Sequence, residues 1–446
     1  MKKVLSVILA ICMVAVLAAA CAADSTPSSA PATPTPGATP APAAPAPTAP
    51  APAPPAPATP APVAPIAPTD GFVEAPFPGR IAIVTNEVSQ NEEEFASAVA
   101  LVARYGPDRV IHRTWPVMFA QEPEMMMSIL VELAGDFEVG AIIINQTVVN
   151  SIAAIDAVRA IRGDDIFIGV VSAAEDPADV SMRVDLALDL NNPLIGELFV
   201  QQAVTMGATA IGHISFPRHM AMPTLAARRE AMAAAAERAG LLFHDITSYD
   251  PMGDGGPAGS QLYILQNMPQ WIATYGRDTV FFSTNCGQQI PLLQQILNYG
   301  GLFVQPCDPS PFHAFPSAFG LASQVPSGLY DAHGEPIMMM VSINDMIEMT
   351  RAAVAEAGMT GRLSNWGIPA AMAFTTAAFY YAVEWMHGSV PTEPGAHPDI
   401  NVINRLIGDY MYAQTGERMY MDLLNLTIGT TVFPMYIVGT SPYILY

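Results

Sequence analysis

From residue 80 onward, short apolar runs alternate with segments whose apolar residues recur every three to four positions. Continuous runs rich in β-branched residues, typical of strands buried on both faces, lie at 81–85, 109–115, 140–145 and 166–172. Segments with the spacing of amphipathic helices lie at 91–102, 122–134 and 148–161. Asn91, with Glu94 three residues later, is the expected N-cap of the first helix. Alternating strands and helices with short connections predict a doubly wound parallel sheet.

A second series with the same pattern follows the segment 185–192. Its expected strands are 208–215, 241–247, 279–284 and 302–306, and its expected helices are 193–206, 223–239, one through Trp271, and 288–298. Two consecutive α/β units of similar size predict two Rossmann-like lobes joined by a hinge, 71–190 and 191–303. The rest, 304–446, is expected to return to and complete the lobes, with apolar helices at 343–357 and 370–386 and then turns and short strands.

The first 70 residues have a different pattern. Lys2 and Lys3 precede an apolar run over 4–20 that is typical of a signal peptide and short for a spanning helix. The run ends in Leu-Ala-Ala-Ala-Cys21, which resembles the lipobox of bacterial lipoproteins and predicts lipidation of Cys21. The alternative is an ordinary signal cleaved near Ala23. Residues 25–70 are almost wholly Pro, Ala, Thr and Ser, so 21–70 is predicted to be a lipid-anchored, extended tether.

Charge limits the kinds of partner. The chain has 18 Lys+Arg against 40 Asp+Glu, a net charge of −22 at pH 7. Such an acidic surface repels phosphate backbones and anionic headgroups. Nucleic-acid binding is therefore excluded, and membrane attachment is expected through the lipid anchor only.

Two Rossmann-like lobes behind a lipoprotein signal resemble the type I periplasmic (solute-)binding protein superfamily, and within it a branch of uncharacterised bacterial lipoproteins. The resemblance covers about residues 80–306 and is carried by IAIVTNEVSQ (81–90), GAIIINQ (140–146) and DLNNPLIGELFVQQAVTMGATAIGHIS (189–215). It implies a hinge of three crossovers, a return to the first lobe near 306–316, and a ligand held between the lobes. The function it implies is solute binding for an ABC-type importer. The alternatives are a sensory lipoprotein reporting to a membrane receptor or kinase, and a surface enzyme.

In open α/β sheets, ligands bind outside the carboxyl ends of the strands. The amides and hydroxyls expected there suit a small polar ligand, neutral or zwitterionic. Trp115 offers a stacking surface, and Arg218 is the obvious partner for a carboxylate or phosphate. The alternatives are helix caps and turns for the polar residues, core packing for Trp115, and an ion pair with an acid for Arg218. The ligand-binding candidates are Asn86, Glu87, Ser89, Gln90, Trp115, Asn145, Gln146, Ser172, Arg218, His219, Asn285 and Asp308; Thr147, Ser215, Asp250, Gln288 and Gln305 also follow expected strands.

Cys286 and Cys307 both fall at ends of expected neighbouring strands, so a disulfide between them and two free thiols are both open. The histidines form no HExxH motif and no i, i+4 pair, so no metal site is predicted. The chain has no G-x-S-x-G elbow, and no G-K-[ST] follows the glycines of GDGGPAG at 253–259. The sequence therefore predicts no catalytic residues and no cofactor.

Overall fold

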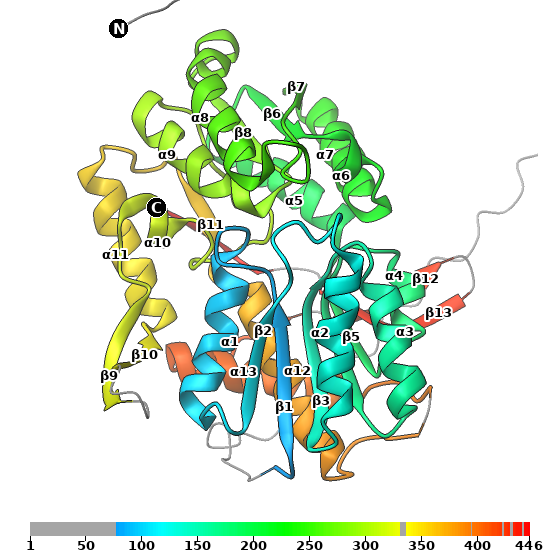
Figure 1. Ribbon diagram of the computed structural model, residues 1–446. Coiled ribbons are helices and arrows are strands. Elements are labelled where there is room, and N and C mark those ends of the chain that lie inside the picture. Colours follow the sequence, from blue (N-terminus) through cyan, green and yellow to red (C-terminus); the bar gives the residue numbers. More distant parts are fainter. Residues whose placement is uncertain (1–76, 331–335, 394, 422, 429–430, 439–440) are drawn as a thin grey trace, which may run out of the picture. The chain divides into compact units, whose positions relative to one another are not determined.

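The larger sheet of the protein carries the first lobe (Figure 1). The computed structural model describes residues 77–446 apart from 331–335, 394, 422, 429–430 and 439–440, so the predicted signal peptide, Cys21 and tether lie outside the described residues. The strand order is β12-β13-β5-β4-β3-β1-β2, parallel except for β12 with β13. The strands are β1 (Arg80–Thr85), β2 (Val110–Thr114), β3 (Val139–Thr147), β4 (Phe167–Ala173), β5 (Leu186–Leu190), β12 (Leu423–Ile428) and β13 (Thr431–Val438).

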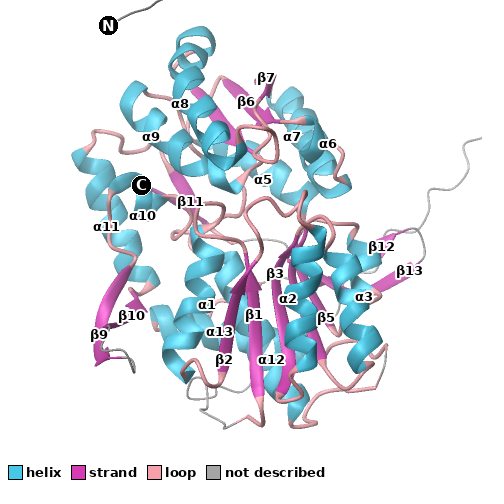
Figure 2. Cartoon of the chain, viewed as in Figure 1, coloured by secondary structure: helices cyan, strands magenta, loops and turns pink. Residues whose placement is uncertain are grey.

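Helices cover both faces of this sheet, as Figure 2 shows. Side chains alternate along β1, so Ile81 and Ile83 join one core while Ala82 and Val84 join the other. On the first face lie α1 (Glu92–Tyr105), α12 (Ala370–Met386) and α13 (Ile400–Thr415); on the second lie α2 (Pro123–Gly135) and α3 (Ser151–Arg162), with the short α4 (Pro177–Ser181) next in the chain. Burial on both faces explains why the strands read as continuous apolar runs.

The second lobe is built on a smaller parallel sheet in the order β7-β6-β8. Its strands are β6 (Ala210–Ser215), β7 (Leu242–Thr247) and β8 (Thr279–Ser283). Its helices are α5 (Asn192–Thr205), α6 (Pro217–Met220), α7 (Pro223–Ala239), α8 (Gly256–Tyr275), the 3-10 turn η1 (Cys286–Gln288) and α9 (Gln289–Tyr299). Gly196 lets α5 and α7 approach closely, because a Cβ there would lie 2.6 Å from the carbonyl oxygen of Arg228. The contact fixes the position of Arg228.

The segment after residue 304 contributes to both sheets. It forms α10 (Phe315–Phe319), the hairpin β9 (Gln324–Tyr330) and β10 (Pro336–Met340), α11 (Ile343–Glu356), β11 (Ser364–Trp366) and β14 (Tyr443–Leu445), besides α12, α13, β12 and β13. Single bridges from Val280 to Leu302 and from Phe303 to Leu363 extend the second sheet toward β11 and β14. The chain therefore crosses between the sheets after β5, after β11 and after β13.

The predicted fold class, two doubly wound α/β lobes joined by a hinge, is confirmed. The expectation of turns and short strands after residue 387 is wrong for Ile400–Thr415, which form α13. In the described part of the chain, no helix is long and apolar enough to span a membrane.

Candidate functional site

A cavity lies at the carboxyl ends of the two parallel sheets and has walls from both lobes. The first lobe contributes the polar side chains of Asn86, Gln90, Gln146, Ser172 and Asp189 and the apolar ones of Phe119, Val148, Val149 and Leu190. The second contributes Asn192, Arg218, His219, Met222, Thr224, Leu225, Arg228, Thr284 and Asn285, followed by Cys286, Cys307 and Asp308. Such a mixture of apolar surface and a few convergent polar groups is typical of a small-molecule site.

Most of the predicted ligand-binding residues meet at this cavity. Asn86, Gln90, Gln146, Ser172, Arg218, His219, Asn285 and Asp308 line it, whereas Glu87, Ser89, Trp115 and Asn145 do not. Of the other strand-end residues, Thr147, Ser215, Asp250, Gln288 and Gln305 also lie off its walls. That the lining residues touch a ligand stays a prediction.

Two strand ends of the first lobe have unusual backbone geometry. Gln146 and Ser172 have φ values of +66° and +61°, a left-handed region that non-glycine residues rarely adopt. Strain of this kind clusters at ligand sites. The Gln146 side chain is fixed by the amide of Asn86, whose Nδ2 donates to Gln146 Oε1 at 2.6 Å.

Asn145 is buried and faces away from the cavity, contrary to the sequence prediction. Its Nδ2 donates to Thr375 Oγ1 of α12 at 2.5 Å. The reason is that Asn145 lies within β3, on the face that Ala141 and Ile143 share and that α12 covers. Trp115 packs in the core of the first lobe, with its Nε1 donating to the carbonyl of Gln146.

Glu87 and Ser89 also make contacts outside the cavity. Glu87 accepts a bond from Thr114 Oγ1 at 2.8 Å. The carbonyl of Ser89 accepts one from Gln261 Nε2 of α8 at 3.3 Å, a link between the two lobes. These two residues therefore position the loop after β1.

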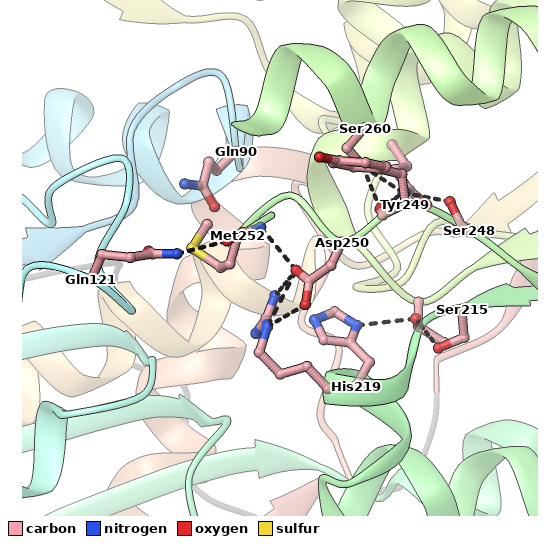
Figure 3. A network of polar contacts seen from close by, with 12 residues as sticks. Gln90, Gln121, Ser215, His219, Ser248, Tyr249, Asp250, Met252 and Ser260 are labelled. Carbon is pink, nitrogen blue, oxygen red and sulfur yellow. Dashed lines mark hydrogen bonds and ion pairs between the residues drawn. The ribbon is translucent and has the colours of Figure 1, made fainter. Parts of the chain in front are cut away.

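On the second-lobe wall, a polar network holds the short helix α6 (Figure 3). Arg218 forms a bidentate pair with Asp250, with Nη2–Oδ1 and Nε–Oδ2 distances of 2.8 and 2.9 Å. Asp250 also accepts from the backbone of Met252, whose carbonyl accepts from Gln121 Nε2 of the first lobe at 2.6 Å. Arg218 is therefore already paired, as the ion-pair alternative requires.

His219 lies beside this pair and is tied to the sheet. Its Nδ1 shares a hydrogen bond with Thr284 Oγ1 at 3.0 Å, and Thr284 in turn bonds Ser215. Burial lowers the pKa of His219 well below its usual range, so the ring is neutral at pH 7. His219 therefore offers a hydrogen bond rather than a charge.

The Arg218–Asp250 pair gives a first prediction. Because its side chains are only 25% and 27% exposed and its geometry is bidentate, we expect a coupling energy of roughly 1 kcal/mol or more. Chemical denaturation of Arg218→Ala, Asp250→Ala and the double variant measures it. Arg238→Ala with Glu197→Ala, an exposed pair, is the matched control and should show little coupling. If the free energy of unfolding lost in the double variant equals the sum of the losses in Arg218→Ala and Asp250→Ala, the prediction is wrong.

Sequence reasoning missed Arg228, a fully buried cation on the cavity wall. The side chain is 2% exposed, Nη1 donates to the carbonyl of Cys307 at 3.0 Å, and the guanidinium lies 5.0 Å from the ring centre of Phe282. Its Nε has no hydrogen-bond partner among the described residues. A signal was present, because Arg228 interrupts the apolar stripe formed by Leu225 and Met232 on its helix.

Asp189 and Asp308 interact electrostatically with Arg228, and two further buried carboxyl groups lie on α1. Asp189, at the end of β5, also lines the cavity, and burial raises the pKa of its carboxyl to about 7. Burial, with the nearby Asp308 carboxylate, raises the pKa of Glu94 to about 8, and burial raises that of Glu93 well above its usual range. Arg228 is therefore the buried cation in a region rich in carboxyl groups.

Cys286 and Cys307 are free thiols in the structure, the alternative to the disulfide that the sequence left open. Their sulfur atoms are 3.0 Å apart, compared with about 2.05 Å in a disulfide. The Cys286 thiol donates to Asp308 Oδ2 at 3.1 Å. The contact with Cys307, together with burial, raises the pKa of Cys286 well above its usual range, and burial raises that of Cys307 to about 11. Both groups are therefore thiols at pH 7.

Residues 80–364 match a family model described as "Protein of unknown function (DUF3798)". The chain belongs to this family. Among curated proteins, this chain is 30% identical to an uncharacterized protein of Treponema pallidum (strain Nichols) over 180 aligned residues. The aligned region covers 39% of this chain and 81% of that protein.

Solved structures resemble the DUF3798 chain in fold. A proposed transcriptional regulator from Clostridium difficile 630 matches with a TM-score of 0.57 and 18% identity over 83% of this chain and 100% of that one. An ABC transporter solute-binding protein from Clostridium phytofermentas with bound L-rhamnose matches with a TM-score of 0.46 and 9% identity, over 82% of this chain and 96% of that one. Together with the strand order, the first match confirms the expected two-lobed α/β fold.

Proposed function

We propose that this protein is an extracytoplasmic solute-binding lipoprotein that holds a small polar molecule between its two lobes. The observation that supports this most directly is the cavity at the carboxyl ends of both sheets. Its lining combines amides, hydroxyls, one buried arginine and two aspartates. Groups of both charges suit a neutral or zwitterionic ligand better than a multiply charged one.

Solute binding would stabilise the conformation in which the two lobes are in contact. Gln121 to Met252 and Gln261 to Ser89 are hydrogen bonds that join the lobes beside the cavity. A ligand that contacts both walls adds its binding energy to the state in which these bonds form. No covalent bond is made or broken. The closed form then docks on an ABC-type permease, and the Cys21 lipid and the tether keep it near the membrane.

Native mass spectrometry of the purified protein, followed by thermal-shift screening of monosaccharides, amino acids and nucleosides, tests solute binding. We expect a co-purifying or stabilising compound whose affinity falls roughly tenfold or more in Gln90→Ala and in Asn285→Ala, because each loses a hydrogen bond worth about 1–3 kcal/mol. Gln201→Ala, an exposed amide on α5, is the control and should bind normally. Binding that all three variants retain would place the solute site elsewhere.

Anchoring through Cys21 gives a further prediction. Cys21→Ala removes the thiol that receives the lipid, so the variant should leave the membrane fraction or remain unprocessed. Cell fractionation with metabolic fatty-acid labelling measures this. Cys12→Ala, within the predicted signal peptide, should behave like wild type. A Cys21→Ala protein that is still acylated and membrane-bound would refute the lipobox interpretation.

A further inference from the structure

Three potential metal ligands that are distant in the sequence meet at one end of the cavity. Cys286 begins η1 just after β8, Cys307 follows the segment that extends the second sheet, and His313 lies six residues farther on. One ligand atom from each of these residues lies within 4.8 Å of the other two. Cys307 is 2% exposed and His313 is 1% exposed. Donors gathered at this distance, and shielded from water, can bind one ion.

The hydrogen bonds of His313 leave one ring nitrogen available. Nδ1 lies 3.0 Å from the carbonyl oxygen of Asp308, and because a carbonyl only accepts, Nδ1 carries the proton. In the neutral ring, Nε2 then has a free lone pair. It is buried and has no hydrogen-bond partner among the described residues. A histidine that donates one nitrogen to a backbone carbonyl and presents the other is the usual arrangement of a metal-bound imidazole.

We propose that Cys286, Cys307 and His313 bind a divalent metal ion of the zinc class, and that the carboxylate of Asp308, which contacts both sulfurs but lies outside the group of donors within 4.8 Å of one another, moves in as the fourth donor. Asp308 Oδ2 lies 3.1 Å from the sulfur of Cys286 and 3.6 Å from that of Cys307. Sulfur and imidazole donors select zinc over magnesium or calcium. Tetrahedral coordination with Zn–S bonds of about 2.3 Å separates two sulfurs by about 3.7 Å, so the thiols need to part by less than about 1 Å.

Charge and protons balance in this site. The ion displaces one proton from each thiol into solvent, and two thiolates and one carboxylate then surround a charge of +2. The remaining negative charge faces Arg228, whose Nη1 already donates to the carbonyl of Cys307 at 3.0 Å. A disulfide, in contrast, would remove the thiol protons that Cys286 and Cys307 donate to Asp308, and it would leave the buried Nε2 of His313 without a partner. The metal satisfies both groups at once.

An ion at this position would connect two segments of the chain and would lie on the wall of the solute cavity. It would fasten the segment 307–313 to η1 of the second lobe. The next residue, Ala314, donates its backbone N–H to Glu92 Oε1 of the first lobe at 2.9 Å, so this segment also touches α1. Cys286, Cys307 and Asp308 line the cavity, which places the ion on its wall. The metal site does not depend on the proposed solute-binding function.

Cobalt(II) titration of the purified protein, reduced and freed of metal with a chelator, tests the proposal. We expect one equivalent to give the thiolate-to-cobalt charge-transfer band and the visible bands of tetrahedral cobalt, and zinc to displace it. Cys286→Ser and Cys307→Ser should each lose the charge-transfer intensity of one thiolate and weaken binding. His313→Asn keeps a donor for the Asp308 carbonyl but lacks the second nitrogen, so its cobalt affinity should fall at least about tenfold.

His397→Asn, an exposed histidine, is the matched control and should bind cobalt as wild type does. Circular dichroism of each metal-free variant establishes whether it is folded. If one variant does not fold, the proposal is tested on the variants that do, by the rise in their melting temperature when zinc is added. The proposal is overturned if no charge-transfer band appears, if His313→Asn binds as tightly as wild type, or if the reduced protein takes up no cobalt. Solute binding by the metal-free protein is measured separately, so failure of one proposal is distinguishable from failure of the other.

Discussion

Replacing Arg228 with methionine should weaken solute binding by roughly a hundredfold while leaving the protein folded. The guanidinium is the buried cation of the cavity wall, and its Nε has no partner among the described residues. A hydrogen bond from a charged group contributes about 1.5–3 kcal/mol, and its loss also leaves the ligand's acceptor unpaired inside the cavity. Methionine has a similar length and a high helix propensity, so α7 should persist.

Arg229→Met is a matched control for Arg228→Met, because the two arginines are neighbours on α7. Arg229 points away from the cavity and pairs with the exposed Asp245. Isothermal titration with the compound found in the thermal-shift screen measures both affinities, and melting curves measure both stabilities. The assignment of Arg228 to the ligand fails if the two variants bind equally well, or if Arg228→Met loses stability but not affinity.

The free energy of unfolding should fall by about 2 kcal/mol between pH 6.5 and pH 8 because of Glu94 alone. The carboxyl is 1% exposed and has a pKa of about 8 in the folded protein, against a normal value of 4.5. The folded state therefore keeps a proton that the unfolded chain has released, and stability falls as pH rises toward the folded pKa. Each pH unit in this range is worth up to about 1.4 kcal/mol.

Buried histidines act in the opposite direction below pH 6.5. Burial lowers the pKa of His112 to about 4 and that of His219 well below its usual range, so the unfolded chain takes up protons that the folded chain does not. Between about pH 4.5 and 6.5 this loss opposes the stability that the carboxyls of Glu94 and Asp189 still gain as the pH falls, so the slope there should be shallower than between pH 6.5 and 8.

Glu94→Gln isolates the contribution of the Glu94 carboxyl to the pH dependence of the free energy of unfolding. Asn86 and Asn91 donate to separate oxygens of Glu94; glutamine keeps an oxygen acceptor for one of these two amides, and it does not titrate. We expect a flatter slope between pH 6.5 and 8 in urea denaturation. Glu124→Gln, an exposed position on α2, is the control and should keep the wild-type slope. Parallel slopes in Glu94→Gln and wild type would refute the buried-proton explanation.

Local patterns predicted the elements of both lobes well. Continuous apolar runs gave β1, β4 and β8 to within a residue or two, because strands buried on both faces need them. Asn91 was predicted to cap α1, and its side chain does accept from the backbone of Glu94 at 3.2 Å. Strand ends were the weak point. β3 runs two residues past its expected end, and Asn145 lies within the strand on the face that α12 covers, outside the expected site.

Contacts between distant segments could not be predicted from one sequence. Arg228 lines the cavity because Gly196 allows two helices to approach, and nothing in the local pattern of either helix pairs them. Cys286, Cys307 and His313 have no motif spacing and meet only because the segment after Leu302 pairs beside β8. Likewise, β13 joins β5 across more than two hundred residues of chain. Such pairings depend on tertiary packing rather than on local periodicity.

The buried indole of Trp115 gives the protein a built-in optical reporter. Its Nε1 donates to the carbonyl of Gln146 at 3.2 Å, and the side chain of the same residue lines the cavity. A solute that displaces Gln146 would therefore change the hydrogen bond of the indole. Indole emission depends on the polarity and hydrogen bonding around the ring. We expect occupancy of the cavity to change the contribution of Trp115, one of four tryptophans, to the intrinsic fluorescence of the unlabelled protein.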